Sequence, residues 1–519
     1  MREPEPAPAA LPASVGAGGT TARHRLLSLA ALVIAVQALY LFEYVVRLPF
    51  IYGPIVDSVV YLHQARALLR GEFGDPSFIA FPPIYGWFLA IFDGGRSPVL
   101  AAATQLGIGC ASIFMVYRIV AKQSGVDAAT ASVLLYLGYG TLLFYESKLV
   151  PDTLGLALGL AASTVYFSSN FAAGRLRYAA GCGALVGLSA LTCPNLIYSA
   201  PPFVAIALLP WQRGSDAPRI GIRLRRALGL GLGVVAVLGV NGLWNFSHSG
   251  LFVPLIRASN YARANSATGA IDALTQDGST SIDAMKIVGA AALEMASVRE
   301  GHYETSTSTM LPEIHFGAWL RGCPSKLAST FSDREITAHE YQYYGERGEV
   351  RMLNLLPVTF GALLLLGALG AFAHARRHGA AALWPFLPGL LGAIATSTLY
   401  HPSSRHRLPV ALAMLLLAGE GLVSIAAIAD RRRRILVATA VTLACGVLAI
   451  RTLTYQRSMP LLWEIRCAQA SIEAGDIWEA NRRNRRMCAL APNDEAVLLH
   501  LKLVMRMPHG CADVPRGEL

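Results

Sequence analysis

Residues 99–121 read VLAAATQLGIGCASIFMVYRIVA, an apolar run in which Arg118 is the only charged side chain. A run of this length matches the hydrocarbon core of a bilayer, and a helix satisfies its backbone polar groups there, so it predicts a membrane-spanning helix. Similar runs recur along the 519-residue chain, which is 54% hydrophobic and 15% charged with a mean hydropathy of +0.45. This composition excludes a soluble globular enzyme and predicts an all-α polytopic membrane protein.

About eleven runs qualify as spans. They are Leu26 to Phe42, Val99 to Ala121, Ala128 to Phe144, Leu149 to Phe167, Tyr178 to Thr192, Leu196 to Pro210, Ala227 to Phe246, Leu355 to Ala373, Ala381 to Leu399, Leu408 to Ile428 and Ile435 to Arg451. The fifth and sixth runs are short and are separated only by Cys193, Pro194 and Asn195. These two could merge or re-enter the membrane.

Basic residues in the loops orient the spans, because short loops rich in Lys and Arg stay on the cytoplasmic side. Placing the N-terminus inside collects most of the loop cations there. These are Arg2, Arg23, Arg25, Arg118, Lys122, Arg175, Arg177, Arg213, Arg219, Arg223, Arg225, Arg226, Arg376, Arg377 and Arg431 to Arg434. The chain is therefore expected to be an integral membrane protein with a cytoplasmic N-terminus and an extracytoplasmic C-terminus. Topology explains the net charge of +11, so nucleic-acid binding is discarded.

The expected organisation has three parts. Residues 1–25, rich in Pro, Ala and Gly, are expected to be a disordered cytoplasmic segment, and residues 26–454 form the membrane domain. Residues 455–519 form an extracytoplasmic tail in which the offsets of one tetratricopeptide-like helix pair are matched by Gly475, Asp476, Ala480 and Pro492. A docked helical hairpin is favoured over a partner-binding module, because a single repeat cannot bury its own face.

Two outer loops, residues 43–98 and 247–354, interrupt the membrane domain. In the first, Ile79 to Phe92 is apolar, but Pro82-Pro83 should prevent a spanning helix. In the second, Ala284 to Met295 is a helix candidate that could belong to a lid.

The eight cysteines contain no CxxC pair, which argues against a zinc site or a thioredoxin-type centre. Four are expected to pack in or near spans, namely Cys110, Cys182, Cys193 and Cys445. Four lie outside, where disulfides are possible but their pairing stays open, namely Cys323, Cys467, Cys488 and Cys511.

Residues 57–71, DSVVYLHQARALLRG, predict a helix closed by Gly71 after the first span. Asp57, Tyr61 and Gln64 share one face, while the cationic side chains of the segment share another. The alternative is an interfacial amphipathic helix with Asp57 as its N-terminal cap.

Two further clusters fall on the same outer side. Glu146 and Asp152 flank Lys148, with loop solvation and a neighbour for Lys148 as the alternative. The segment from His401 to Pro409 contains Arg405, His406 and Arg407 on the side that should be poor in positive charge. Anion binding at the outer membrane face explains this segment, and headgroup anchoring is the alternative.

Outer carboxylates beside an anion site suit glycosyl transfer from a polyprenyl-phosphate sugar. A base deprotonates the acceptor hydroxyl, and cations stabilise the departing phosphate. The sequence identifies no cofactor and leaves the metal requirement open; a divalent cation between Asp57 and Glu146 is conceivable because hard cations take carboxylates, although no spacing demands it. The expected partners are the lipid-linked donor, a glycan, lipid or protein acceptor, and membrane lipids.

These residues resemble the GT-C superfamily of integral-membrane glycosyltransferases, including protein O-mannosyltransferases, aminoarabinose transferases and Rgt-type enzymes. The resemblance runs from about Leu26 to Leu422. It is carried by Asp57 with Tyr61 and Ala65, Phe81-Pro82-Pro83-Ile84-Tyr85, Glu146 to Asp152, Gly187 to Pro194, and Arg405-His406-Arg407-Leu408-Pro409.

The resemblance implies an inverting enzyme with Asp57 as catalytic base or key polar ligand and with Glu146 or Asp152 as the second acid. Arg405 would contact the lipid phosphate. His406 and Arg407 would assist, and Tyr61 and Tyr85 would line the substrate site. Cys193 and Trp244 stand where relatives commonly carry arginine, so donor handling could differ. The competing functions are a transporter or flippase of lipid-linked sugars, disfavoured because few charges lie within spans, and a non-catalytic scaffold.

Overall fold

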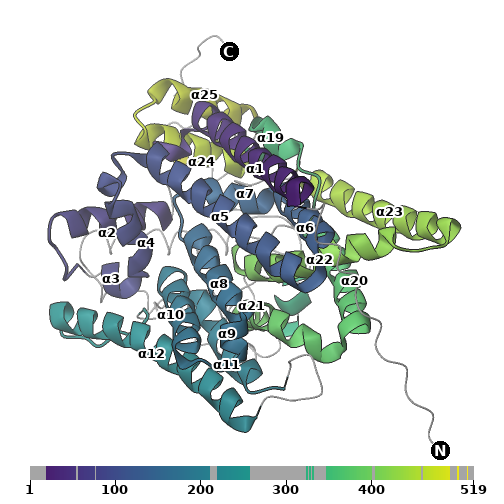
Figure 1. Cartoon of the computed structure of the whole chain (residues 1–519). Coiled ribbons are helices and arrows are strands. Elements are labelled where there is room, and N and C mark those ends of the chain that lie inside the picture. The colour runs from purple at the N-terminus through teal and green to yellow at the C-terminus, as the bar shows by residue number, and fades with distance from the viewer. Residues whose placement is uncertain are drawn as a thin grey trace, which may run out of the picture.

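The computed structural model describes most of the membrane domain and part of the tail. The described residues are 19–53, 57–75, 77–210, 219–256, 346–399, 404–456 and 460–490, with isolated positions between 323 and 331 and at 500, 501 and 511. Every regular element in this part of the chain is a helix, which confirms the predicted all-α class. Figure 1 shows the helices packed against one another, with α24 and α25 near α1 and α19 and with α23 projecting from the rest.

The first half of the chain contains α1 (Gly19–Arg47), η1 (Pro49–Ile51), α2 (Asp57–Leu69), α3 (Ser77–Ala80), α4 (Pro83–Ala90), η2 (Asp93–Gly95), α5 (Pro98–Ser124), α6 (Val126–Gly138), α7 (Gly140–Ser147), α8 (Asp152–Tyr166), α9 (Ser169–Ala172), α10 (Leu176–Thr192), η3 (Pro194–Ser199), α11 (Ala200–Ala207) and α12 (Ile220–Ser249). The second half contains α19 (Arg351–Asn354), α20 (Phe360–His378), η4 (Ala380–Phe386), α21 (Leu387–Leu399), α22 (Ser404–Ala426), α23 (Arg431–Gln456), α24 (Pro460–Glu473) and α25 (Ile477–Leu490).

Within the described residues, fewer helices reach spanning length than the eleven predicted for the whole chain. By length and composition, five described segments could cross a membrane, and a sixth if a bent pair counts as one span. The five are His24–Arg47, Pro98–Ser124, Ile220–Ser249, Ala380–Thr398 and Ser404–Ala426. Several apolar helices support an integral membrane protein, but the count of eleven is not confirmed.

Helix breaks account for part of the difference. The run predicted from Ala128 to Phe144 divides at Tyr139 into α6 and α7, which are bent by 62°. The predicted fifth and sixth spans become α10, the 3-10 turn η3 beginning at Pro194, and the eight-residue α11. Proline removes a backbone hydrogen-bond donor and disfavours the helical conformation of the residue before it, so these short helices stay separate.

Helix α22 occupies the centre of the largest apolar core and packs against α20 and α6. Small residues permit the close approach, since a Cβ added to Gly370 would lie 1.9 Å from the carbonyl oxygen of Leu417. A Cβ on Gly419 would similarly lie 2.0 Å from the carbonyl oxygen of Ala128. Backbone contact of this kind is typical of helix packing in membranes, and here it holds the C-terminal half of α22 against α20 and α6.

The first outer loop forms the helices that the sequence predicted. The segment that begins at Asp57 forms helix α2, which ends at Leu69. Gly71 follows with φ of +77°, a conformation that glycine adopts without strain. Its predicted faces are confirmed, because Tyr61 and Gln64 are buried while Arg66 is exposed. Helix α4 begins at Pro83 and has eight residues, too few to cross a bilayer. In the second outer loop, the candidate helix Ala284 to Met295 lies outside the described residues.

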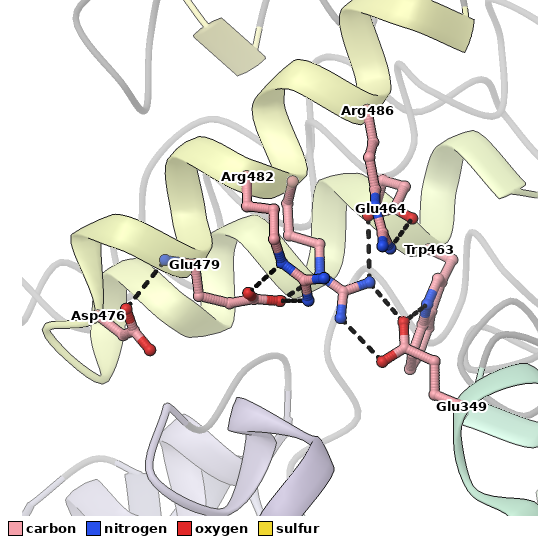
Figure 2. Close-up of polar contacts among 8 residues, drawn as sticks. Glu349, Trp463, Glu464, Asp476, Glu479, Arg482 and Arg486 are labelled. Atoms are coloured by element: carbon pink, nitrogen blue, oxygen red, sulfur yellow. Dashed lines mark hydrogen bonds and ion pairs between the residues drawn. The ribbon is translucent and has the colours of Figure 1, made fainter. Parts of the chain in front are cut away.

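The tail contains a helical hairpin, α24 and α25, that docks on the rest of the chain through a buried cation (Figure 2). The Arg483 side chain is fully buried, and its guanidinium donates to Glu349 at 2.5 and 2.8 Å, to Glu464 at 3.2 Å and to Glu479 at 2.6 Å. The indole of Trp463 also donates to Glu349, at 3.0 Å. Burial alone would raise the pKa of Glu349, but the hydrogen bonds from Arg483 and Trp463 hold it below its usual value.

Two further contacts secure the hairpin. Trp463 packs on Phe50 of η1 with ring centroids 5.4 Å apart, and Cys488 forms a disulfide with Cys511. The sequence left the pairing of the outer cysteines open, and the structure pairs Cys488 with Cys511. Cys467 is a buried free thiol. The docked hairpin is present, whereas its tetratricopeptide-like character is not established.

Replacing Arg483 should release the hairpin. In Arg483→Ala the carboxylates of Glu349 and Glu464 lose their shared cation, and breaking a buried pair costs about 3–5 kcal/mol. We expect faster hydrogen exchange throughout α24 and α25, measured by mass spectrometry on the detergent-solubilised chain. The matched control is Arg486→Ala, because Arg486 is 42% exposed and 3.4 Å from Glu464. Its loss should change stability by less than about 1 kcal/mol, and equal exchange in the two variants would contradict the role given to Arg483.

Candidate functional site

Three segments far apart in the sequence meet at the guanidinium of Arg405. Its Nη1 lies 2.6 Å from Oδ2 of Asp57, and its Nε lies 2.7 Å from Oδ1 of Asp152. Arg405 is the second residue of α22, Asp57 begins α2 and Asp152 begins α8. The predicted convergence of Asp57 and Arg405 is therefore observed, and Asp152 rather than Glu146 is the second carboxylate.

All three charged side chains lie at helix N-termini, where the helix dipole stabilises the two carboxylates and destabilises the guanidinium. The N-terminus of a helix carries partial positive charge, which stabilises Asp57 and Asp152 where they stand. Arg405 lies in the first turn of α22, where the same effect is unfavourable. The two carboxylates offset this cost, and the cluster as a whole keeps one net negative charge.

The two carboxylates differ in access to solvent. The side chain of Asp57 is 27% exposed and that of Asp152 is 3% exposed. Within the described part of the chain, Oδ2 of Asp152 is buried without a hydrogen-bond partner. A buried acceptor without a partner is costly, so this oxygen is placed to receive a donor from a bound molecule.

A cavity opens beside the cluster. It is lined by Asp152, Cys193, Asn195, Leu196, Ser199, Gly389, Gly392, Thr396, Arg405, His406 and others. Asn195 and His406 are within hydrogen-bonding distance of each other through Nδ2 and Nε2. Cys193 lines the cavity at the position where the resemblance would place an arginine, so Arg405 and His406 provide the cationic or donor groups there.

An apolar groove continues from this cavity and shares Leu156, Leu196, Ser199, Gly389 and Pro409 with it. On α8 the lining residues recur every three or four positions from Gly155 to Phe167, which is one face of the helix. From Asp152 this face extends about 22 Å at 1.5 Å per residue. Phe203, Phe386 and Leu416 complete the groove from other elements, so a charged head and an apolar channel form one continuous site.

Tyr61 and Tyr85 pack behind the carboxylates. Their rings meet edge to face with centroids 5.1 Å apart, and the hydroxyl of Tyr85 donates to Oε1 of Gln105 at 2.7 Å. Burial raises the pKa of both phenols well above its usual value, although the positive charge of Arg405 opposes the shift. Both phenols stay protonated, and Tyr61 interacts electrostatically with Asp57 and Arg405.

The predicted cluster around Lys148 divides into three separate environments. Glu146 accepts hydrogen bonds from Gln37 at 2.5 Å and from Tyr136 at 2.7 Å. Lys148 pairs with Glu346 of the second outer loop, and Asp152 pairs with Arg405. The alternative of loop solvation is wrong for this cluster, since Glu146, Lys148 and Asp152 are all buried, whereas the expected neighbour for Lys148 is found.

Two predicted residues lie away from the cavity. Glu146 does not line it, and the contacts of Glu146 give no support to a divalent cation shared with Asp57. Arg407 is buried with its guanidinium 4.2 Å from the ring centroid of Phe360, and it lines neither cavity nor groove. His401 lies outside the described residues.

Sequence reasoning missed Gln105, Asn195 and Glu346. Gln105 sits in a predicted span, and an isolated polar residue in an apolar run is a signal for a functional or packing role. It donates to the carbonyl oxygens of Glu146 and Lys148 and so fixes the loop that leads to Asp152. No local pattern marks Glu346, whose partner is 198 residues away.

Comparison of the sequence with protein-family models gave no match, and neither did comparison with curated proteins. Among solved structures, the chain is similar to archaeal oligosaccharyltransferase AglB from Archaeoglobus fulgidus, in complex with an inhibitory peptide and a dolichol-phosphate, at 14% identity and a TM-score of 0.41. That alignment covers 86% of this chain and 58% of the archaeal protein. The chain is also similar to apo ArnT from Cupriavidus metallidurans, at 13% identity and a TM-score of 0.40, over 91% of this chain and 80% of ArnT.

Proposed function

We propose that this chain is a membrane glycosyltransferase that transfers a sugar from a polyprenyl-phosphate donor to an extracytoplasmic acceptor, with Asp57 as the base. The observation that carries the proposal is the Asp57–Arg405–Asp152 cluster at the head of an apolar groove. A charged head joined to an apolar channel suits a ligand with a phosphate at one end and an isoprenoid chain at the other.

The donor phosphate would bind at Arg405. A guanidinium has five N–H donors, and the contacts with Asp57 and Asp152 use Nη1 and Nε. Its planar fork matches phosphate oxygens. The isoprenoid chain would follow the face of α8 from Leu156 to Phe167, where lining side chains are mostly apolar.

The reaction needs a base and a stabilised leaving group. The acceptor hydroxyl oxygen attacks the anomeric carbon, the bond from that carbon to the phosphate oxygen breaks, and the bonding electrons leave on the polyprenyl phosphate. Asp57 takes the hydroxyl proton, and Arg405 and His406 stabilise the phosphate charge. Attack opposite the leaving group gives inversion at the anomeric carbon.

Exposure assigns different roles to the two acids. A base must reach an incoming acceptor, and Asp57 is 27% exposed whereas Asp152 is 3% exposed. Asp152 therefore positions Arg405, and Oδ2 of Asp152 can accept a hydrogen bond from a sugar hydroxyl. An extracytoplasmic location of the tail is supported by the Cys488–Cys511 disulfide, because such bonds persist in oxidising compartments.

Asp57→Asn should reduce transfer by at least about 100-fold, since general base catalysis contributes about 10²–10⁴-fold. The amide oxygen can still accept from Arg405, so expression and thermal unfolding should be nearly unchanged. The measurement is release of polyprenyl phosphate from a panel of polyprenyl-phosphate sugars by purified chain in vesicles.

The matched control for this test is Asp75→Asn in the same outer loop. Asp75 is partly buried and bonds to His63 at 3.0 Å, away from the Arg405 cluster. This variant should keep wild-type transfer. Full activity in Asp57→Asn would remove Asp57 as the base.

Arg405→Lys should weaken donor binding by about 1.5–3 kcal/mol, the scale of a charge-assisted hydrogen bond. Lysine keeps the positive charge between Asp57 and Asp152 but loses the fork that binds two oxygens at once. Donor affinity is measured by equilibrium binding of a labelled polyprenyl phosphate. Arg96→Lys, at an outer arginine that is 84% exposed, is the control. Equal affinities in the wild type and both variants would place the phosphate elsewhere.

A further inference from the structure

A second polar cluster lies near the opposite end of α22 from Arg405. His374 and His378 are one turn apart on α20, and Glu420 faces them from α22. One ligand atom from each of the three side chains lies within 4.8 Å of the other two. We propose that His374, His378 and Glu420 bind a divalent transition-metal ion, with Zn²⁺ as the ion that the set fits best.

The histidine spacing places both rings on one helical face. Residues four apart on a helix are neighbours, and the rings of His374 and His378 have centroids 4.7 Å apart. His374 is fully buried, and its Nε2 has no hydrogen-bond partner among the described residues. Only one nitrogen of an imidazole can bind a given ion, and Nδ1 is the nitrogen beside Glu420, so Nε2 is the position of an outer-shell hydrogen bond.

The distance between His374 and Glu420 requires little movement for ion binding. Nδ1 of His374 lies 2.7 Å from Oε2 of Glu420. Two tetrahedral ligands at about 2.0–2.1 Å from zinc are roughly 3.3 Å apart, so the pair would open by about 0.6 Å. His378 is partly exposed and gives the ion a path from solvent.

The chemistry of the ligands selects the metal. Two imidazoles and one carboxylate suit zinc and neighbouring transition metals, whereas calcium and magnesium prefer all-oxygen sites. Three protein ligands leave a fourth position for water. Ser124 of α5 donates to Oε2 of Glu420 and would orient the carboxylate as an outer-shell partner.

Arg377 is the cation that competes with a metal at Glu420. Its Nη1 lies 3.4 Å from Oε1, the other carboxylate oxygen, and its side chain is 44% exposed. It can turn toward solvent or bond to Ser424, whose Oγ is 3.2 Å from Nη2. The competing explanation is therefore a metal-free hydrogen-bonded clamp between α20, α22 and α5.

The proposed metal site is separate from the Arg405 cluster. Glu420 follows Arg405 by 15 residues on α22, which corresponds to about 22 Å along the axis. Glu420 lies 3.4 Å from Arg377, which with Arg376 belongs to the basic residues that the sequence predicts to be cytoplasmic. An ion here would fasten α20 to α22 on the side of the membrane away from sugar transfer.

The experiment uses the full chain, purified in detergent with a tag that contains no histidine and stripped with a chelator. Zn²⁺ is added, excess ion is removed, and bound zinc is counted by mass spectrometry. Co²⁺ provides a second readout, because its visible absorption reports nitrogen and oxygen ligands. We expect one ion per chain in the wild type and in Asp57→Asn, which separates this site from the proposed transferase site.

Two ligand variants complete the test. His378→Asn and Glu420→Gln should each weaken zinc binding by at least about 100-fold, since even outer-shell partners are worth about 10–100-fold. His248→Asn, at an exposed outer histidine, is the matched control and should bind as the wild type does. Because His378 is partly exposed, its variant carries the test if Glu420→Gln fails to fold. Wild-type chain that holds no zinc, or undiminished binding in His378→Asn, would overturn the proposal in favour of the metal-free clamp.

Discussion

The buried guanidinium of Arg405, shared by two carboxylates, is the interaction on which the candidate site depends. It joins Asp57 and Asp152, which are 348 and 253 residues away in sequence. Ions removed from water are stable only when paired, and removing one partner of such a pair costs about 3–5 kcal/mol. Helices α2, α8 and α22 must therefore stay together for any of the three charges to remain buried.

The same constraint recurs where other distant segments meet. Lys148 is buried against Glu346 of the second outer loop, and Arg483 is buried against Glu349 beside it. Apolar helix faces give little selectivity in lipid, because lipid tails are as apolar as the side chains. Polar pairs are selective, since an unpaired partner in the same place is costly. The few ionic contacts thus specify which helices and loops of this chain pack together.

Sequence reasoning predicted the helical class, the α2 helix and the meeting of Asp57 with Arg405. It did not anticipate the break at Tyr139 within a predicted span, because average hydropathy does not register such a break between α6 and α7. It also grouped Glu146 with Asp152, although a non-helical turn lies between them and directs the two carboxylates to different partners. Such divergence depends on backbone direction over a few residues, which residue spacing alone does not determine.

The shared guanidinium also links donor binding to base activation under the proposed function. In the structure the carboxylate of Asp57 pairs with Arg405 at 2.6 Å, and a positive charge this close opposes proton uptake by a carboxylate. A donor phosphate drawn to the same guanidinium competes with Asp57, whereas the more buried Asp152 keeps Arg405 in place through Nε. Arrival of the phosphate would thereby release the exposed carboxylate and raise its basicity. An anionic phosphate near a lone carboxylate would itself raise the basicity of that carboxylate, and competition for the shared guanidinium adds to this effect, so the cluster favours proton abstraction when there is a sugar to transfer.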